Sequence, residues 1–526
     1  MKLYRSFATV GGLTMISRVL GFVRDILFAW AFGSGWVADA FNVAFRFPNL
    51  FRRLFGEGAF NSAFIPLFAK KLEGEGRDAA RAFAEEAMAG LLVVLVLVSV
   101  VAMVAMPWLM YLLAPGFSAN AEKFDLAVLL TRIAFPYLAC MSLVALMSGV
   151  LNSFGRFAES AGVSIVLNLT LTVAIFIGFA LGFHNDPGGG VIQALGVFVA
   201  GLLQLALLMD GLRRAGFRLG LRRPRMTDDV RRLISLGVPG IVSGGVTQIN
   251  IMIGTMIASL QPGAVSQLYY ADRLYELPLA IVGIAIGVVL LPEVSRHLRA
   301  GDETAVMDSQ NRSLELAMLL TVPAAVALAV VPVEIIRVLF ERGAFGVSDT
   351  LATASALAIF AWGLPSFVLI KVFSPAYFAR EDTRTPMRYA TISLFANTAG
   401  SIALFFVFRS MGLLPQLGIA LASALGGWLN AGLLFTTLVD RGHFVFDARA
   451  RRALPLIVVA SLLMGVVLWV GARVLAPWLA SGEPLWSKAA ALSALIGGAM
   501  LVYGVAMVAT GVLRPSMLRR RSKVAA

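Results

Sequence analysis

The stretch GLLVVLVLVSVVAMVAM, residues Gly90–Met106, carries no charged side chain and a single hydroxyl group. An α-helix with this sequence is apolar on every face, so it must be surrounded by lipid or by other helices. About 20 such residues cross the hydrocarbon core of a bilayer. A second run of this kind, IVVASLLMGVVLWVGA, occupies residues 457–472. These segments predict α-helices that span a membrane.

The composition extends this prediction to the whole chain. Of its 526 residues 59% are hydrophobic and 14% are charged, with a mean hydropathy of +0.84, whereas soluble proteins average about 25% charged residues. The alternating apolar and polar residues of an outer-membrane barrel are absent. A single cysteine, Cys140, excludes an internal disulfide framework and a multi-cysteine metal site. We therefore expect an all-α polytopic membrane protein.

Apolar runs and the polar residues between them predict fourteen transmembrane helices. The predicted spans lie near residues 6–33, 37–68, 82–113, 124–152, 159–182, 190–212, 230–259, 265–295, 312–340, 349–376, 388–409, 416–439, 453–474 and 487–513.

Basic residues are distributed unequally between the two sets of connections. With the amino terminus inside, thirty of the 44 Lys and Arg residues fall in inside segments and six fall in outside segments. This asymmetry follows the positive-inside rule, so we expect both termini on the cytoplasmic side of the membrane. The net charge of +14 is then a feature of topology. Its expected partner is the anionic lipid of the inner leaflet rather than nucleic acid.

A weak internal repeat divides the chain. FIPLFAKKLEGEGRDAA (64–80) is similar to LLPEVSRHLRAGDETA (290–305), and further matches keep an offset of 225 to 229 residues. Six spans per copy is an even number, so both copies enter the membrane from the same side and a substrate site is expected at their interface. The matched positions are Pro66 with Pro292, Pro107 with Pro332, Pro136 with Pro365, and Asn168 with Asn397.

The repeat predicts the domain organisation. Residues 1–212 form a first lobe of six spans, residues 213–229 form a basic cytoplasmic linker, and residues 230–440 form a second lobe of six spans. Residues 441–526 add two spans without a counterpart in the repeat, followed by a basic tail.

Charged residues inside the spans mark the candidate site. RFPNLFRRLFGEG (Arg46–Gly58) places three arginines and a glutamate at membrane depth, where a charge costs roughly 2.5–3.5 kcal/mol. Pro48 with Asn49 predicts a break midway along this span. Eight basic residues lie within spans, and six of them are in the first, second and eighth spans. These six are Arg18, Arg24, Arg46, Arg52, Arg53 and Arg273, and the nearby carboxylates are Asp25, Asp39, Glu57, Asp272 and Glu276.

Two interpretations of this cluster remain open. The charges could form internal salt bridges that join helices, or they could line a polar cavity in which guanidinium groups bind an anion. Spacing places Asp39, Arg46 and Arg53 on one helical face, and it permits pairs between Arg18 and Asp25 and between Arg273 and Glu276. Arginine suits phosphate because its planar fork donates two parallel hydrogen bonds and does not deprotonate.

Enzymatic chemistry has little support in the sequence. No GxxxxGK[ST] loop is present, and no nucleophile or histidine–carboxylate constellation lies at membrane depth. The three histidines lie far apart in loops, so no metal site is predicted. A polyprenyl-phosphate-using membrane transferase stays open as an alternative from a different class.

Five segments carry a resemblance to a known family. The chain resembles the MurJ (MviN) family of lipid II flippases in SRVLGFVRD (17–25), ADAFNVAFRFPNLFRRLFGEGAFNSAFIP (38–66), LYYADRLYELP (268–278), LFERGAF (339–345) and YFAREDTRTP (377–386). The resemblance implies the fold of the multidrug/oligosaccharidyl-lipid/polysaccharide exporter superfamily, with two MATE-like six-helix lobes and two added helices. It also implies alternating access and transport of lipid II, the undecaprenyl-pyrophosphate-linked peptidoglycan precursor, across the bacterial inner membrane.

The resemblance also implies the site residues. Substrate-binding arginines of the family carry over onto Arg18, Arg24, Arg52 and Arg273, each within a matching motif. Supporting or gating residues are expected at Asp25, Asp39, Arg53, Glu57, Glu276 and Asn168.

The sequence also bears on the ion or potential that could drive transport, and it leaves other functions open. Some family members bind sodium through acidic residues of the seventh and eleventh spans, but here the seventh span offers Gln248 and Asn250 and the eleventh has no carboxylate. This argues against a sodium site, and we expect no cofactor, with the membrane potential as a candidate energy source. The cell-wall synthesis machinery is an expected protein partner. A flippase for another polyprenyl-linked saccharide and a MATE-like cation or drug antiporter remain alternatives.

Overall fold

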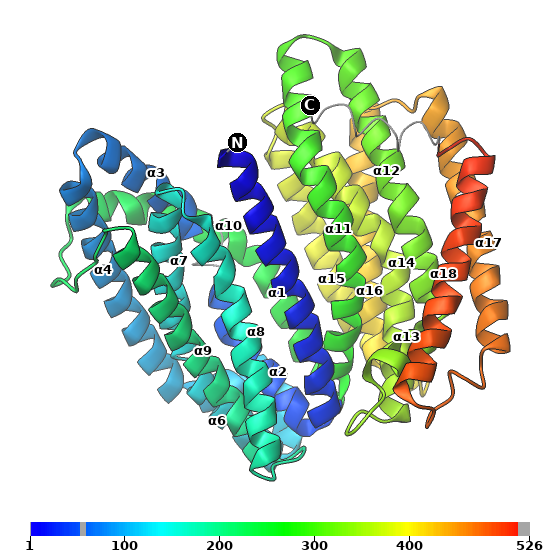
Figure 1. Cartoon of the computed structure of the whole chain (residues 1–526), viewed down its shortest axis with the longest axis horizontal. Helices are drawn as coiled ribbons and strands as arrows, with labels where there is room; N and C mark the ends of the chain where they lie inside the picture. Colours follow the sequence, from blue (N-terminus) through cyan, green and yellow to red (C-terminus); the bar gives the residue numbers. More distant parts are fainter. Residues whose placement is uncertain (1, 53–58, 514–526) are drawn as a thin grey trace. The chain divides into compact units, whose positions relative to one another are not determined.

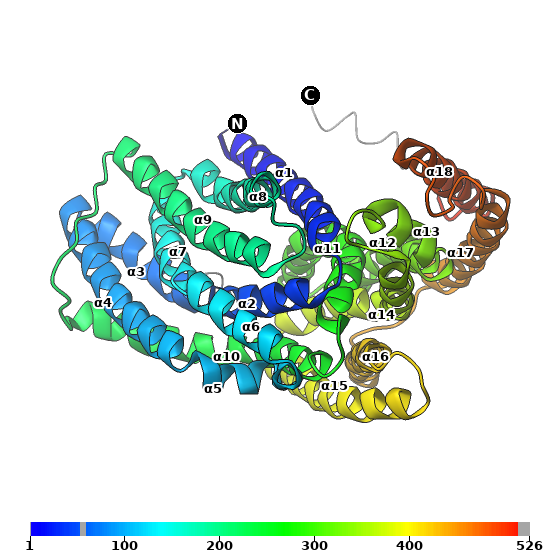
Figure 2. The same ribbon diagram turned by 90° about the horizontal axis from the view of Figure 1, so that it is seen from below.

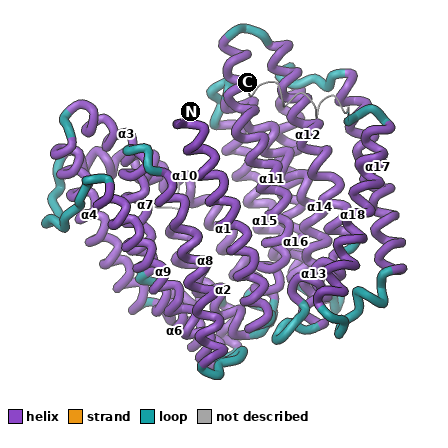
Figure 3. Tube along the Cα trace, viewed as in Figure 1, coloured by secondary structure: helices purple, strands orange, loops and turns teal. Residues whose placement is uncertain are grey.

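The structure of the protein is a computed structural model that describes residues 2–52 and 59–513. Side chains are described except at 2–8, 50–52, 59–62, 238–247, 249–250, 284–285 and 287–289. Within these ranges the chain forms eighteen α-helices and one 3-10 helix, with no strand (Figure 3). This confirms the prediction of an all-α protein.

In chain order the elements are α1 (Lys2–Phe32), α2 (Trp36–Arg52), α3 (Ala59–Gly74), α4 (Arg77–Val104), α5 (Met106–Leu113), η2 (Pro115–Ala119), α6 (Ala121–Ala134), α7 (Tyr137–Ser153), α8 (Phe157–Ala180), α9 (Pro187–Arg214), α10 (Asp228–Ala258), α11 (Ala264–Arg299), α12 (Glu303–Val330), α13 (Pro332–Phe340), α14 (Val347–Phe378), α15 (Arg384–Ser410), α16 (Gln416–Asp440), α17 (Ala448–Val474) and α18 (Leu485–Ala509).

Each predicted span coincides with one of these helices or with a consecutive pair. Ten helical segments of the described chain are long and apolar enough to cross a membrane. The protein is therefore a multi-pass membrane protein, and the exact number of fourteen crossings stays a prediction. The paired helices are α2 with α3, α4 with α5, α6 with α7, and α12 with α13.

Prolines explain several of the helix boundaries. Pro107 and Pro332 lie in the first turns of α5 and α13, where the missing N–H group costs nothing. Pro136 separates α6 from α7. The predicted break at Pro48 with Asn49 is wrong, because α2 continues through Pro48 to Arg52. A proline removes a single helical hydrogen bond, which can bend a helix without ending it.

The chain forms two compact units. Unit 1 contains Met1–Ser266 together with Arg342–Phe345, and unit 2 contains Gln267–Glu341 with Gly346–Ala526. In unit 1, α1 packs beside α8, α8 beside α9, and α2 beside α6 (Figure 1). Helix α10 packs against α3 in the same unit (Figure 2). This division by packing therefore differs from the division by sequence repeat, which places residues 230–259 in the second half.

A close backbone contact brings Arg342–Phe345 into unit 1. The N–H of Ala344 donates a hydrogen bond to the carbonyl oxygen of Trp30 at 2.9 Å. Gly343 has a φ of 59°, and a Cβ atom there would lie 2.4 Å from that carbonyl oxygen. Only glycine fits this position, because it tolerates positive φ and has no Cβ.

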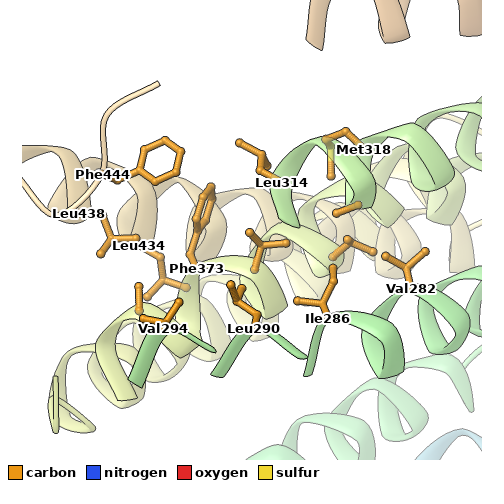
Figure 4. Close-up of a cluster of buried hydrophobic side chains, with 14 of the residues drawn as sticks. Val282, Ile286, Leu290, Val294, Leu314, Met318, Phe373, Leu434, Leu438 and Phe444 are labelled. Carbon is orange, nitrogen blue, oxygen red and sulfur yellow. The ribbon is translucent and has the colours of Figure 1, made fainter. Parts of the chain in front are cut away.

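Unit 2 is built around α14, which packs against α12 and α16. Its core contains a buried cluster in which Phe373, Leu434 and Phe444 lie together, with Leu314 and Met318 on α12 (Figure 4). Helices α17 and α18 were predicted as an appended pair. They pack on each other, α17 also lies along α12, and α18 also contacts α13.

The close packing of α15 and α16 in unit 2 leads to a first prediction. A Cβ atom at Gly418 would lie 2.5 Å from the carbonyl carbon of Leu404. Gly418→Ala is therefore expected to destabilise the protein by about 1–3 kcal/mol, because the two backbones must move apart. Thermal unfolding of the purified protein in detergent measures this effect.

The control for this prediction is Gly432→Ala in the same helix. A Cβ atom at Gly432 meets no atom within 4 Å. Since alanine is a better helix former than glycine by about 1 kcal/mol, this variant is expected to be neutral or slightly more stable. Equal melting temperatures for the two variants would show that the contact at Gly418 is not close.

Candidate functional site

Arg24 lies at the centre of a polar cluster between α1 and α8. Its Nη2 atom is 2.6 Å from Asp25 Oδ1, and its Nε atom donates to the same oxygen at 3.1 Å. Its Nη1 atom donates to Asn168 Oδ1 on α8 at 3.1 Å. Asn168 in turn donates to the carbonyl oxygen of Ser17 at 3.0 Å. The cluster thus brings together three residues predicted from the sequence.

The Arg24 cluster is almost completely withdrawn from solvent. The side chains of Arg24 and Asp25 are 11% and 2% exposed, and Asn168 is 8% exposed. A buried carboxylate beside a buried guanidinium neutralises a charge that would otherwise be costly to bury. The hydrogen bonds also hold the guanidinium plane in one orientation. The arrangement therefore combines a structural ion pair with a fixed cationic group.

Arg18 has a different environment on the same helix. Its side chain is exposed and makes no hydrogen bond or ion pair with the described residues. Spacing permitted a pair between Arg18 and Asp25, but the structure pairs Asp25 with the adjacent Arg24 instead. Ser17 and Arg24, seven residues apart, form the face that meets α8. Arg18 therefore has its hydrogen-bonding capacity available to a ligand.

Asp39 is a fully buried carboxylate at the start of α2. It accepts a hydrogen bond from Lys123 Nζ at 2.7 Å. It also accepts from the N–H of Gly263 at 2.9 Å, from the N–H of Ser266 at 3.0 Å and from Ser266 Oγ at 2.8 Å. Gly263 directly precedes α11 and Ser266 lies in its first turn, where unpaired N–H groups attract a negative charge. Asp39 thus caps a helix and neutralises a buried lysine.

Two further contacts continue along the same face of α2. Asn42 Nδ2 donates to Ser266 Oγ at 3.0 Å. Arg46 Nη1 donates to Thr255 Oγ1 near the end of α10. The spacing that placed Asp39 and Arg46 on one face is therefore confirmed, and this face makes polar contacts between secondary-structure elements of unit 1.

The predicted residues of unit 2 lie on α11. Arg273 Nη1 is 3.7 Å from Glu276 Oε2, one helical turn away, as their spacing predicted. Their side chains are 34% and 45% exposed, so this pair is far less buried than the Arg24 cluster. Tyr275 stacks on Phe360 and Phe367 at centroid distances of 5.1 and 5.9 Å. These rings hold the central part of α11 against α14.

Three predicted site residues cannot be placed in this geometry. Arg53 and Glu57 lie outside the described residues, and Arg52 ends α2 without a described side chain. Of the predicted residues in unit 1, the structure brings together Arg24, Asp25 and Asn168, and it places Asp39 in a separate cluster.

Several residues of the Asp39 cluster were missed by sequence reasoning. Lys123 was counted as a loop residue, yet its side chain is 8% exposed and pairs with Asp39. Its ammonium group also lies 4.1 Å from the centroid of the Phe117 ring. The turn QPGA at 261–264, directly before a long apolar run, was the available signal for the start of a helix that needs a cap.

The chemistry available in these clusters is electrostatic. They supply guanidinium groups and carboxylates but no nucleophile paired with a base. Among the described residues, no group of three or more His, Cys, Asp or Glu side chains is arranged to hold a metal ion.

Comparison with solved structures defines the class of protein. A structure titled "Lipid II flippase MurJ, inward closed conformation" matches with a TM-score of 0.76 and 24% identity, covering 94% of this chain and 97% of that one. A MATE family transporter of the MOP superfamily, in an inward-facing conformation, matches with a TM-score of 0.65 and 14% identity, covering 82% and 97%. The chain therefore has the fold of the MATE-like membrane transporters.

Sequence comparisons identify the family within this class. The family model "Lipid II flippase MurJ" matches residues 28–487. A probable lipid II flippase MurJ of Rhizobium tropici is 49% identical over 526 residues, covering 99% of this chain and 97% of the relative. The lipid II flippase MurJ of Burkholderia cenocepacia is 34% identical, covering 99% and 100%. The chain belongs to the MurJ family of lipid II flippases, and it is a transporter rather than an enzyme.

Proposed function

We propose that this protein moves lipid II from the inner to the outer leaflet of the cytoplasmic membrane for peptidoglycan synthesis. The observation that carries the proposal is the match to lipid II flippases along nearly the whole length of both chains. The fold supports it, since MATE-like transporters share this architecture. Two guanidinium groups on α1, the exposed Arg18 and the largely buried Arg24, supply the chemistry that a pyrophosphate requires.

The pyrophosphate is bound by Arg18, Arg24, Arg52 and Arg273. Arg18 contributes an exposed guanidinium that makes no ion pair with the described residues. Arg24 contributes a guanidinium whose orientation is held by hydrogen bonds to Asp25 and Asn168. Arginine forks bind phosphate oxygens through paired, charge-assisted hydrogen bonds.

The supporting residues have distinct roles in this proposal. Asp25 and Asn168 orient Arg24, and Glu276 orients Arg273 from one turn further along α11. Asp39 holds the start of α11 beside α2 and so belongs to the gating machinery. Arg53 and Glu57 lie in the same sequence segment as Asp39, residues 38–66, and are assigned to the gating machinery with it.

Transport proceeds by alternating access of two six-helix lobes, residues 1–212 and 230–440, while the polyprenyl tail stays in lipid. Both termini face the cytoplasm, as the distribution of basic residues indicates. Moving an anion outward is favoured by about 2.3 kcal/mol per charge per 100 mV, so the membrane potential is a candidate energy source. Collapsing the potential at constant sodium and proton gradients is expected to slow flipping, and unchanged flipping would exclude this source.

The experiment that tests the function measures lipid II at the outer leaflet. Cells depleted of their own flippase express this chain, and an externally added enzyme cleaves the exposed lipid II. We expect the wild-type chain to restore the cleaved fraction. If it restores nothing despite normal insertion into the membrane, the assigned substrate is wrong, and another polyprenyl-linked saccharide or a cation would be tested next.

Arg273→Ala provides a prediction for unit 2 in the same assay. Loss of one charge-assisted contact to the pyrophosphate is expected to reduce flipping roughly tenfold or more. The matched control is Arg409→Ala, also in unit 2, because Arg409 is exposed near the end of α15 and makes no side-chain hydrogen bond or ion pair with the described residues. Equal activity of both variants would remove Arg273 from the binding site.

A further inference from the structure

The linker between α9 and α10, residues 215–227, has a defined path across one end of unit 1. It is anchored by Glu85 in α4, whose side chain is 2% exposed. The Glu85 carboxylate accepts a hydrogen bond from the N–H of Gly220 at 2.7 Å and lies 2.5 Å from Arg222 Nε. Arg81 donates to the same carboxylate at 3.0 Å. Two of these three donors, Gly220 and Arg222, belong to the linker, so the buried carboxylate fixes the linker to α4.

Aromatic contacts fix the beginning of the linker. Phe217 is 3% exposed, and its ring lies edge-on to Phe68 and tilted against Phe154, at centroid distances of 5.8 and 5.1 Å. Arg77 donates to the carbonyl oxygen of Ala215 at 3.1 Å. The linker is therefore a built part of unit 1.

A pocket of about 550 Å³ lies between this linker and the helices. Small-molecule pockets commonly enclose roughly 300–1,000 Å³. Its walls come from α4, α7 and α9, all of which belong to segments apolar enough to cross a membrane. Met88, Met147 and Leu205 line its apolar part. Leu205 precedes the end of α9 by nine residues, so the apolar wall extends roughly 14 Å along this membrane-crossing helix.

Two arginines complete the lining at the opposite end. Arg213 lies in the last turn of α9 and Arg218 lies in the linker. Both are exposed, and neither side chain makes a hydrogen bond or ion pair with the described residues. Their neighbours Arg214 and Arg222 each contact a carboxylate, at 2.7 and 2.5 Å. The pocket therefore joins a long apolar wall to two cationic groups that have no counter-ion there.

We propose that this pocket binds an anionic glycerophospholipid. The phosphate group lies against Arg213 and Arg218, and one acyl chain follows the apolar wall along α7 and α9. Basic pockets between helices at the membrane surface recognise anionic headgroups in this way. The guanidinium fork suits a phosphodiester because two of its N–H groups match two phosphate oxygens.

The combination of groups favours a lipid over other occupants. A soluble phosphate would neutralise the arginines but leave the apolar wall without an apolar partner in the pocket, which is unfavourable. A neutral hydrocarbon chain would cover the wall and leave both arginines without a counter-ion. Only an amphiphile with an anionic headgroup satisfies both ends. This binding site is independent of lipid II transport and does not rest on the proposed function.

The test is lipid retention by the purified full-length protein, measured by native mass spectrometry. Phosphatidylglycerol and phosphatidylcholine with identical acyl chains are added separately to the delipidated protein in detergent. We expect one phosphatidylglycerol to be retained in preference to phosphatidylcholine. Each basic residue near an anionic lipid surface contributes about a fivefold gain in binding, so Arg213→Gln with Arg218→Gln is expected to weaken retention about 30-fold.

The matched control is Arg223→Gln with Arg225→Gln, which removes two exposed charges from the same linker outside the pocket lining. This control is expected to change retention less than twofold. Leu205→Trp places a larger side chain in the apolar part of the pocket and leaves the charges in place. This variant is expected to weaken phosphatidylglycerol retention about tenfold. Three outcomes would overturn the proposal. The two lipids could be retained equally, or the control double variant could weaken phosphatidylglycerol retention as much as Arg213→Gln with Arg218→Gln does. The third is that Leu205→Trp leaves retention unchanged.

Discussion

Asp39→Ala is expected to cost about 3–5 kcal/mol of stability, the range measured when one partner of a buried ion pair is removed. The Asp39 side chain is fully buried, and its partner Lys123 is 8% exposed. Removing the carboxylate leaves the lysine without a counter-ion in an apolar environment. It also leaves the N–H groups of Gly263 and Ser266 without an acceptor at the start of α11.

Thermal unfolding of the purified protein and the yield of folded protein measure this loss. Asp125→Ala is the matched control, because Asp125 lies on α6 close to Lys123 in sequence but is exposed. It is expected to leave the melting temperature unchanged. A melting temperature of Asp39→Ala equal to that of the control would contradict the capping role.

A double variant separates the ion pair from the helix cap. Asp39→Asn with Lys123→Met removes both charges and keeps an oxygen that can accept from the α11 backbone. The single variant Asp39→Asn leaves Lys123 without a counter-ion. We expect the double variant to recover a large part of the stability that Asp39→Asn alone loses, because no charge is then left unpaired. If the double variant is as unstable as the sum of the single variants, the two residues are not coupled.

Arg18→Ala and Arg24→Ala are expected to separate binding from folding. Arg18→Ala should reduce flipping roughly 10- to 100-fold, the effect of losing hydrogen bonds to a charged group, with an unchanged melting temperature. The reason is that Arg18 is exposed and makes no hydrogen bond or ion pair with the described residues that folding would lose. Arg24→Ala should reduce both flipping and stability, because Asp25 is 2% exposed and loses its neighbouring cation.

Two measurements on each variant decide this prediction. Flipping is measured as the outer-leaflet fraction of lipid II, and stability as the melting temperature of the purified protein. Arg18→Lys keeps the charge without the planar fork and is expected to recover only part of the activity. Full activity of Arg18→Ala would remove Arg18 from the binding site, and a lower melting temperature would show that Arg18 has a structural role.

Much of the candidate site was predictable from local sequence. Unusual charges inside apolar runs marked Arg18, Arg24, Asp25 and Asp39 as important, since burial of a charge is costly wherever the helix packs. Helical spacing also placed Asp39 and Arg46 on one face. The spacing argument failed for Asp25, because adjacent residues on a helix can still pair when one side chain is a long arginine.

The amino-acid sequence by itself determined that this protein is a bundle of membrane helices with charged groups inside its apolar runs. Hydrophobicity and helical period are local properties, readable within about 20 residues. Only the tertiary structure decided which charges meet. Lys123 and Ser266 are 84 and 227 residues from Asp39 along the chain, yet both contact its carboxylate. Such partners are selected by the packing of whole helices, because a buried charge is stabilised by whichever donors the fold brings within hydrogen-bonding distance.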